Sequence, residues 1–327
     1  MTSRECVQAV LKGEVPEAVP RALYDVAINT YNQSTLDLFQ KMLGRHPRDC
    51  FRQDLRGVHV QGPPQDTDWR RRVRDVATPE AARAALRPWV EHQPDIEGLR
   101  RQVAEIHRAG CAAVAVGWIS DFETPFGLRG REQFFIDIAE EAEWLPVFLD
   151  GIAQAAANSA RAAGLAGADI FGIGDDLGSQ RGLLISPGHW RRLFKPRLKS
   201  IIAALKDANP ETAFFLHTDG LVTELVPDFI EVGVDILNPV QPEVMDLPSL
   251  KREYGDELVF FGGISVQYTL PFGTPRDVYN EVKERMETIG AGGGYLMTPS
   301  HLVNADIPWE NIVAFFDAAE RYGRSAR

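Results

Sequence analysis

From Asp95 onward the chain alternates short apolar segments with longer amphipathic ones, and this alternation limits the possible folds more than any other feature. Short strands that each lead into a helix are typical of a parallel sheet covered by helices. The expected strands are 112–118, 169–173, 213–216, 235–237, 258–261 and 294–297. The expected helices are 96–109, 131–164, 187–206, 221–232, 247–254, 275–289 and 308–322.

The first third of the chain is less regular. Thr2 and Glu5 fit a capping box that opens a short helix ended by Gly13. Two weak strands are expected at 19–26 and around 57–61, followed by a polar surface insertion at 66–93, with a helix at 35–43 between the strands. The total of about eight strands is the number that closes a barrel.

We therefore predict an α/β fold: a (β/α)8 (TIM) barrel with an N-terminal helical extension and an insertion in the first third. The barrel is expected to be a single domain over residues 1–327. An open, doubly wound sheet is the alternative, because it shows the same alternation. No G-x-G-x-x-G motif follows an expected strand, which disfavours the dinucleotide-binding form of that alternative.

Charge and cysteine content narrow the class of partner and the compartment. The formal net charge is −11 and the basic residues are scattered, which argues against nucleic acid. The 3 cysteines lack CxxC spacing and suit a reducing compartment. No signal core or run of about 20 apolar residues occurs. We expect a cytoplasmic protein without membrane contact, and the oligomeric state stays open, a homodimer included.

Polar side chains follow five of the expected strands. The loops after barrel strands build the active site, so these groups are expected to meet at one rim and to bind a small polar ligand or a metal. The segments are Gly174-Asp175-Asp176 with Gln180, His217-Thr218-Asp219-Gly220, Gln241-Pro242-Glu243, Gly262-Gly263-Ile264-Ser265 with Gln267, and Ser300-His301.

Several of these groups also have a structural interpretation. Asp175 and Asp176 can cap a loop or the next helix, and Asp219 can cap the helix that follows it. His217 and Asp219 are two positions apart in an extended segment, so their side chains can face the same way, which favours a functional pair.

Glu243 and His301 stand in less regular surroundings. Pro242 implies a turn that can point Glu243 into solvent, so both interpretations of Glu243 stay open. His301 lies between a strand and a loop that ends at Pro308, a position that favours function.

The same segments resemble the uroporphyrinogen decarboxylase superfamily. This superfamily of (β/α)8 barrels contains porphyrinogen decarboxylases and corrinoid- or coenzyme M-linked methyltransferases. The resemblance covers about the last two-thirds of the chain. It runs through Gly174-Asp175-Asp176, 182–187, His217-Thr218-Asp219-Gly220, 231–243, Phe261-Gly262-Gly263-Ile264-Ser265, Pro299-Ser300-His301 and 308–311.

The chain departs from the porphyrinogen decarboxylases near its N-terminus. There, the decarboxylases carry an arginine-rich stretch that grips the carboxylate arms of the porphyrinogen. This chain has Arg21 and then Asp25. A substrate with many carboxylates needs several bidentate cations, so tetrapyrrole decarboxylation is not expected.

The chain also departs from the coenzyme M methyltransferases, which bind zinc through a His-x-Cys pair and a distant cysteine. Asp219 stands where the first cysteine would be, and His301 stands near the second. The resemblance thus implies a nitrogen and oxygen ligand set of His217 and Asp219 with Glu243 or His301. Such ligands leave more positive charge on zinc than thiolates do, which suits an ether or hydroxyl oxygen.

We predict a methyltransferase that moves a methyl group from a small methylated compound, a methoxy compound in an O-demethylase-type reaction, to a corrinoid on a separate carrier protein, with zinc assistance. His301 would be the third ligand or the acid for the leaving oxygen, with Asp175 and Asp176 as further catalytic residues. The alternatives are a metal-free decarboxylase with His301 or Asp175 as proton donor, and a non-enzymatic ligand-binding barrel. The expected substrate-binding residues are Gln180, Gln241, Gln267, Arg21 and Asp25.

Overall fold

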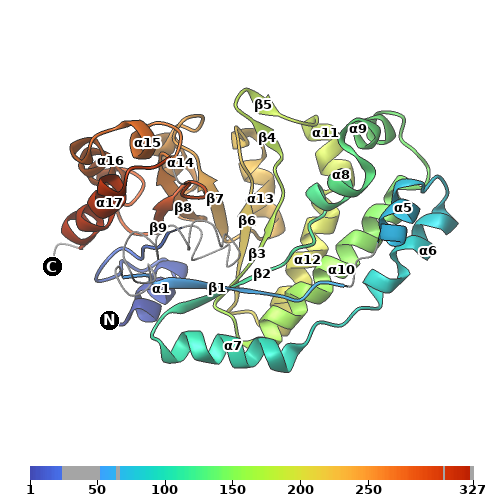
Figure 1. Ribbon diagram of the computed structural model, residues 1–327, viewed down its shortest axis with the longest axis horizontal. Helices are drawn as coiled ribbons and strands as arrows, with labels where there is room; N and C mark the ends of the chain where they lie inside the picture. Colours follow the sequence, from blue (N-terminus) through green and yellow to red (C-terminus); the bar gives the residue numbers. More distant parts are fainter. Residues whose placement is uncertain (24–51, 64–66, 305, 325–327) are drawn as a thin grey trace. The chain divides into compact units, whose positions relative to one another are not determined.

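The computed structural model describes residues 1–23, 52–63, 67–304 and 306–324 (Figure 1). These residues form two compact units. The first unit is Met1–Val58, Gln102–Val114 and Asp235–Arg327, and the second is His59–Arg101 and Ala115–Val234. The expected helix at 35–43 lies outside the described residues.

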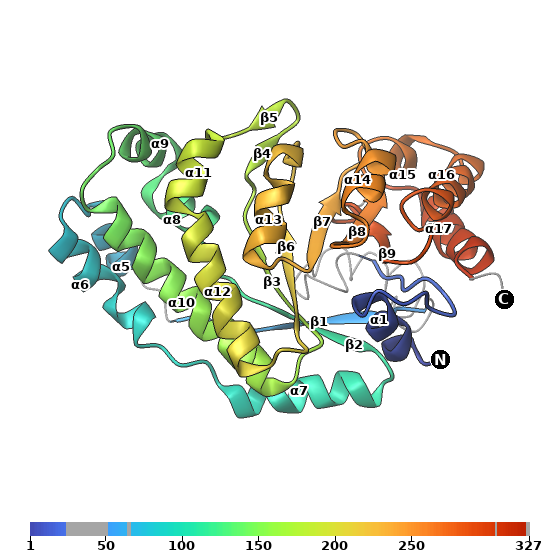
Figure 2. The same ribbon diagram turned by 180° about the vertical axis from the view of Figure 1, so that it is seen from behind.

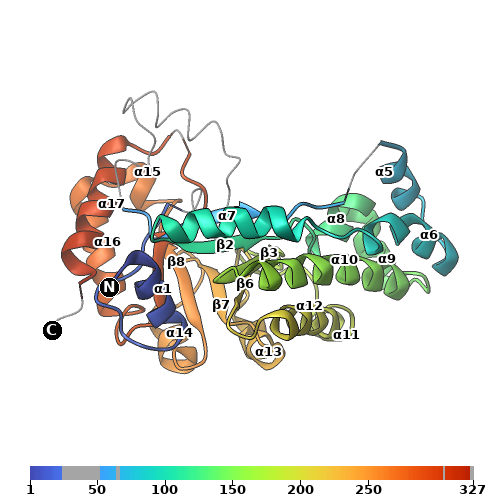
Figure 3. The same ribbon diagram turned by 90° about the horizontal axis from the view of Figure 1, so that it is seen from below.

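The first unit contains three parallel strands, β7 (Ile236–Val240), β8 (Val259–Ile264) and β9 (Tyr295–Pro299). β8 pairs with β7 on one side and with β9 on the other. Helices α16 and α17 pack against each other in this unit (Figure 3). Its helices are α1 (Ser3–Leu11), α14 (Leu247–Tyr254), α15 (Thr269–Phe272), α16 (Pro275–Glu287) and α17 (Trp309–Tyr322).

The N-terminal segment of the first unit confirms the expected capping box but not the expected strand. Thr2 and Glu5 form the capping box of α1, in which each side chain accepts a hydrogen bond from the backbone N–H of the other. Residues 19–23, the described part of the expected strand at 19–26, form no strand and contain one isolated bridge, at Arg21. Arg21 forms a parallel bridge with Met297 of β9, and its carbonyl accepts from the backbone N–H of Asp54 at 2.8 Å. This segment therefore lies between β9 and the residue just before β1 (Leu55–His59).

The second unit contains the parallel pair β3 (Ile170–Gly174) and β6 (Ala213–His217), in which Gly174 lies opposite His217. Gly117, directly after β2 (Ala112–Val116), donates its N–H to the Gly172 carbonyl at 2.9 Å. A short antiparallel hairpin, β4 (Gly178–Ser179) and β5 (Gly182–Leu183), follows β3.

Helices form one wall of this unit, where α10 packs against both α6 and α12 (Figure 2). The segment expected as a polar surface insertion is the helical pair α5 and α6, and α6 buries Leu86 and Trp89. A Cβ added to Gly151 of α10 would lie 2.7 Å from Leu86 Cδ1, so the two helices approach closely. The helices of the second unit are α5 (Thr67–Arg74), α6 (Pro79–Val90), α8 (Glu123–Arg129), α9 (Arg131–Ala139), α10 (Leu145–Ala166), α11 (Pro187–Leu193), α12 (Lys195–Ala208), the 3-10 turn η1 (Thr223–Leu225) and α13 (Val226–Val232). The remaining helix, α7 (Ile96–Arg108), has residues in both units.

The prediction of an α/β fold with parallel strands is confirmed. The described residues include 7 strands outside the short β4–β5 hairpin. Within each unit, the parallel pairs join strands that follow one another in this set, β3 with β6, β7 with β8 and β8 with β9. Their cores are apolar: Ile170, Phe171, Phe214 and Phe260 are fully buried. None of the helices in the described part of the chain combines the length and the apolar composition that a membrane span requires.

Candidate functional site

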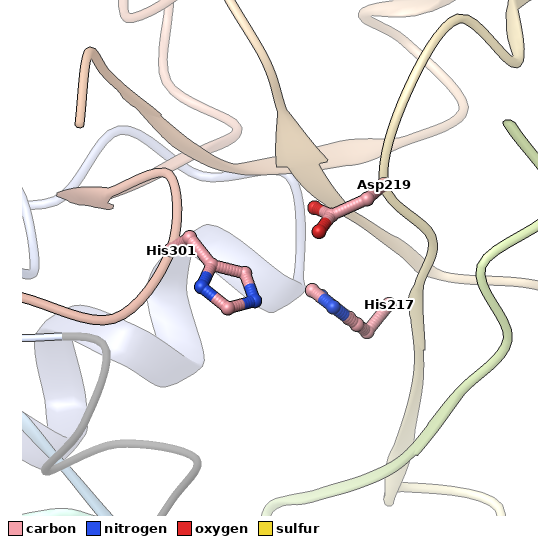
Figure 4. Close-up of side chains that lie close together, drawn as sticks. All are labelled: His217, Asp219 and His301. Carbon is pink, nitrogen blue, oxygen red and sulfur yellow. The ribbon is translucent and has the colours of Figure 1, made fainter. Parts of the chain in front are cut away.

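His217 and Asp219 form the centre of the candidate site in the second unit. His217 is the last residue of β6, and its side chain is 12% exposed. Each residue offers one metal-ligating atom, and these atoms lie within 4.8 Å of one another (Figure 4). The carboxylate of Asp176 accepts a hydrogen bond from the Asp219 backbone N–H at 3.0 Å and lies 3.7 Å from His217 Nε2. Asp176 therefore supports both residues.

Two glycines let the β4–β5 hairpin pack directly on the loop that carries Asp219. A Cβ added to Gly178 would lie 2.7 Å from the Asp219 carbonyl oxygen. Gly220 has a φ of +86°, and a Cβ added there would lie 2.5 Å from the Gly178 carbonyl carbon. Leu221 also donates its N–H to the Ser179 carbonyl at 2.9 Å. No side chain larger than hydrogen fits at either glycine without backbone movement, so this packing fixes the position of Asp219.

Asp175, which we expected to be catalytic, holds the fold together instead. It is 2% exposed, and its Oδ1 accepts hydrogen bonds from the backbone N–H groups of Phe122 at 3.0 Å and Glu123 at 2.8 Å. Burial, and the nearby carboxyl group of Asp175, raise the pKa of Asp121 well above its usual range. The raised pKa favours the protonated form of Asp121, and the two backbone hydrogen bonds to Asp175 anchor the start of α8.

Glu123 belongs to the same cluster, and we did not predict it from the sequence. A Cβ added to Gly174 would lie 3.4 Å from His217 Cδ2 and 3.8 Å from Glu123 Oε2, so these two side chains flank one point of β3. Although the residue as a whole is exposed, its carboxyl group is partly desolvated. Desolvation, together with Asp176 and Asp175, raises the pKa of Glu123 to about 7. In the sequence, Glu123 is an ordinary acid in the first turn of a helix, and only the fold brings it to His217.

The polar residues after β7 and β8 form a buried network in the first unit. Glu243 accepts a hydrogen bond from the Ser265 hydroxyl. The Ser265 backbone N–H donates to Glu281 Oε1 at 3.2 Å, and Arg285 pairs with the same oxygen at 3.2 Å. One oxygen of Glu243, which we expected as a possible metal ligand, is thus already bonded within the fold. Gln241 is 5% exposed.

The remaining expected substrate-binding residues are scattered. Arg21 is 3% exposed, and its guanidinium is ion-paired with Glu320 of α17, which is a structural role. Gln180 is exposed in the turn between β4 and β5, and Gln267 is exposed after β8. Asp25 lies outside the described residues.

His301 follows the last strand of the first unit. Ser300 donates its backbone N–H to the Ile264 carbonyl at 2.9 Å, which holds the start of this loop against β8. His301 itself is partly buried. Its imidazole offers a nitrogen atom in the loop that follows a parallel strand.

A known family has this order of strands and strand-end residues. The model of the uroporphyrinogen decarboxylase (URO-D) family matches residues 102–322. The chain belongs to this family. The URO-D match includes β2 and every later strand, and it leaves out β1. It also includes His217, Asp219 and His301.

Both reaction types of the URO-D superfamily occur among the relatives. The chain is 28% identical over 174 residues to the methylcobamide:CoM methyltransferase MtaA of Methanosarcina barkeri, which covers 53% of this chain and 48% of that protein. It is 24% identical over 182 residues to a uroporphyrinogen decarboxylase of Psychromonas ingrahamii. That alignment covers 54% of this chain and 48% of the decarboxylase. The chain thus spans about half the length of these curated relatives.

A solved structure matches over a larger part of the chain. A methyltransferase from Methanosarcina mazei superimposes with a TM-score of 0.68 at 18% identity, over 98% of this chain and 99% of that one. At this identity the match shows a shared fold. It extends the similarity to the N-terminal third, which the family model leaves out.

Proposed function

We propose that this URO-D family protein is a methyltransferase that moves a methyl group from a small methoxy compound to a corrinoid on a separate carrier protein. The observation that carries the proposal is the imidazole of His217 beside the carboxylate of Asp219, within 4.8 Å of it. The relative MtaA has a methylcobamide in its name, which supports a corrinoid as the partner in methyl transfer.

We also propose that the two compact units form one (β/α)8 barrel domain over residues 1–327. The parallel pairing within each unit and the bridge between Arg21 and β9 support this arrangement. The full-length similarity to a methyltransferase of the same fold supports it further. In such a barrel the ends of β6 and β9 open on the same rim, so His301 would join His217 and Asp219.

The donor atoms of this site fit zinc. Catalytic zinc sites accept histidine nitrogen and carboxylate oxygen, and they use three protein ligands with one open position. A carboxylate beside a ligating imidazole, as Asp176 is beside His217, is a common supporting group in such sites. When bound, the metal would supply Lewis-acid polarisation of the ether oxygen.

The residues of the chain would then position the substrate and its proton. In the transfer, the bond between the methyl carbon and the oxygen breaks. The oxygen would keep the bonding pair and take a proton, and the corrinoid of the carrier protein, when bound, would supply the cobalt(I) that accepts the methyl group. His217 and Asp219 would hold the metal, and His301 would be the third ligand or the acid. Asp176, Gln180, Gln241 and Gln267 are the candidates for orienting the substrate.

The test is a reconstitution with purified components. The protein, a methoxylated donor and a corrinoid carrier reduced to cobalt(I) are combined, and the absorption spectrum is followed for methyl-corrinoid. We expect the product only when all three are present, and we expect it to be lost in Asp219→Ala. Release of CO2 from a carboxylated substrate without any corrinoid would instead establish a decarboxylase.

A further inference from the structure

The second unit carries an aromatic pair that the proposed metal site does not use. His59 is the last residue of β1, and Trp118 follows β2 by two positions. Their rings are stacked, with centroids 4.8 Å apart and an interplanar angle of 17°. Trp118 is 57% exposed, although it is among the largest apolar side chains of the protein. Burial lowers the pKa of His59 to about 4, so its ring is neutral at physiological pH.

This aromatic pair stands close to the cluster around His217 within the same unit. The residue before Trp118, Gly117, is hydrogen-bonded to Gly172 of β3 at 2.9 Å. Gly174, two residues further along β3, lies opposite His217. Since a parallel strand rises about 3.3 Å per residue, the backbone at Trp118 is roughly 10 Å or less from Gly174. That distance is about the length of a substituted benzene ring.

We propose that the His59–Trp118 pair binds the aromatic ring of the substrate, and that the methyl donor is an aryl methyl ether. This inference rests on the proposed function, whose substrate it narrows. A third ring can extend the stack on the exposed indole, because aromatic rings pair favourably at centroid distances of about 4.5–7 Å. An aliphatic donor such as methanol has no ring to stack and would gain little from this surface.

The charges nearby narrow the substrate further. Asp176, Glu123 and Asp219 bring carboxyl groups to the ends of β3 and β6, where Asp176 lies 3.7 Å from His217 Nε2. These carboxyl groups would repel a carboxylate on the substrate. The ring is therefore expected to carry neutral hydroxyl or methoxy groups, as in 2-methoxyphenol.

The test measures binding by calorimetry, without corrinoid. The probes are 2-methoxyphenol, its demethylated product catechol, and methanol. We expect Trp118→Ala to weaken binding of both aromatic probes about tenfold or more, and Trp118→Phe to keep it within about threefold, because phenylalanine preserves a ring. Phe272→Ala is the matched control, since Phe272 is an 80% exposed aromatic residue in the first unit, and it is expected to bind like wild type. Thermal unfolding of each variant checks that the fold is intact.

The outcomes separate this inference from the proposed function. Wild-type binding of the aromatic probes by a folded Trp118→Ala variant would overturn the aromatic site. Methyl transfer from methanol but not from 2-methoxyphenol would also overturn it and would leave the methyltransferase proposal standing. Trp118-dependent binding of catechol without any methyl transfer would support the aromatic site and count against methyl transfer.

Discussion

The ends of the strands in the two units carry similar polar residues, but the fold uses them differently. In the first unit, Glu243 and Glu281 are tied to Ser265 and Arg285, so hydrogen bonds and one guanidinium offset part of the cost of burial, although burial still raises the pKa of Glu281. In the described part of the second unit, no cation offsets the carboxyl groups near His217 to the same extent, and burial together with neighbouring carboxyl groups raises the pKa of Asp121 and of Glu123.

The difference teaches that a polar residue after a strand is not functional by its position alone. A carboxylate with a buried cation beside it stabilises the fold, whereas carboxyl groups held close to one another cost free energy of folding unless a cation or a proton joins them. This excess of negative charge supports the proposal that the second unit binds a metal. The predictions below test that contrast.

The largest effect is expected in the first unit, where Arg285→Met removes the guanidinium that pairs with Glu281. The variant leaves a buried carboxylate without its cation, which should lower the free energy of unfolding by about 3–5 kcal/mol. Denaturant titration measures the loss. Arg252→Met, at an exposed arginine of α14, is the control and should stay within about 0.5 kcal/mol of wild type. A loss below about 1 kcal/mol in Arg285→Met would remove the distinction between the two units.

The next effect concerns metal binding in the second unit. His217→Ala and Asp219→Ala should each weaken zinc binding about 100-fold or more, because even residues that only support a ligand cost about 10- to 100-fold. Elemental analysis and zinc titration of the purified proteins measure this. His189→Ala is a matched control, because His189 is partly exposed and bonded to Ser186 in the same unit. Zinc retained at wild-type affinity in both site variants would refute these ligands.

Gly220→Ala tests whether the backbone contact positions Asp219. The strained φ and the close approach to Gly178 should cost about 1–3 kcal/mol of stability and should weaken zinc binding as well. Gly127→Ala serves as control, because nothing lies within 4 Å of an added Cβ at that position in α8. If Gly220→Ala lost stability but kept full zinc affinity, the hairpin would not be what positions the ligand.

The smallest effect is a pH dependence of the metal-free protein. The raised pKa of Glu123, about 7, means that the folded state holds this proton when the unfolded state, at about 4.5, has released it. Stability from this group is therefore present below about pH 4.5 and is lost as the pH rises through 7. Glu123→Gln should flatten the fall in melting temperature between pH 5 and 8. An unchanged pH profile in this variant would show that the pKa of Glu123 is not raised in the folded protein.

Much of the fold could be predicted because strand and helix periodicities are local properties of the sequence. The strands at 169–173, 213–216 and 258–261 needed only their apolar runs and the polar residues that follow them. The expected insertion at 66–93 was wrong in character, since its many arginines hid the one apolar face that α6 packs on α10.

The site could be predicted only in part, because it depends on contacts between elements far apart in the sequence. The spacing of His217 and Asp219 suggested their pairing, and the structure brings them together. Nothing local distinguishes Asp175, which accepts two backbone hydrogen bonds, from Asp176, which lies beside His217. Glu123 and the stack of His59 on Trp118 likewise require the register between neighbouring strands.

The close contact between Gly178 and Gly220 also bears on how such a site can evolve. The contact involves backbone atoms alone, so it places no demand on which side chain stands at position 219. In the proposed metal site, a soft sulfur ligand could therefore be exchanged for a hard oxygen one by a change at position 219 alone, while the backbone around it stays the same. The type of ligand atom at position 219 can thus vary without any change in the backbone that holds it.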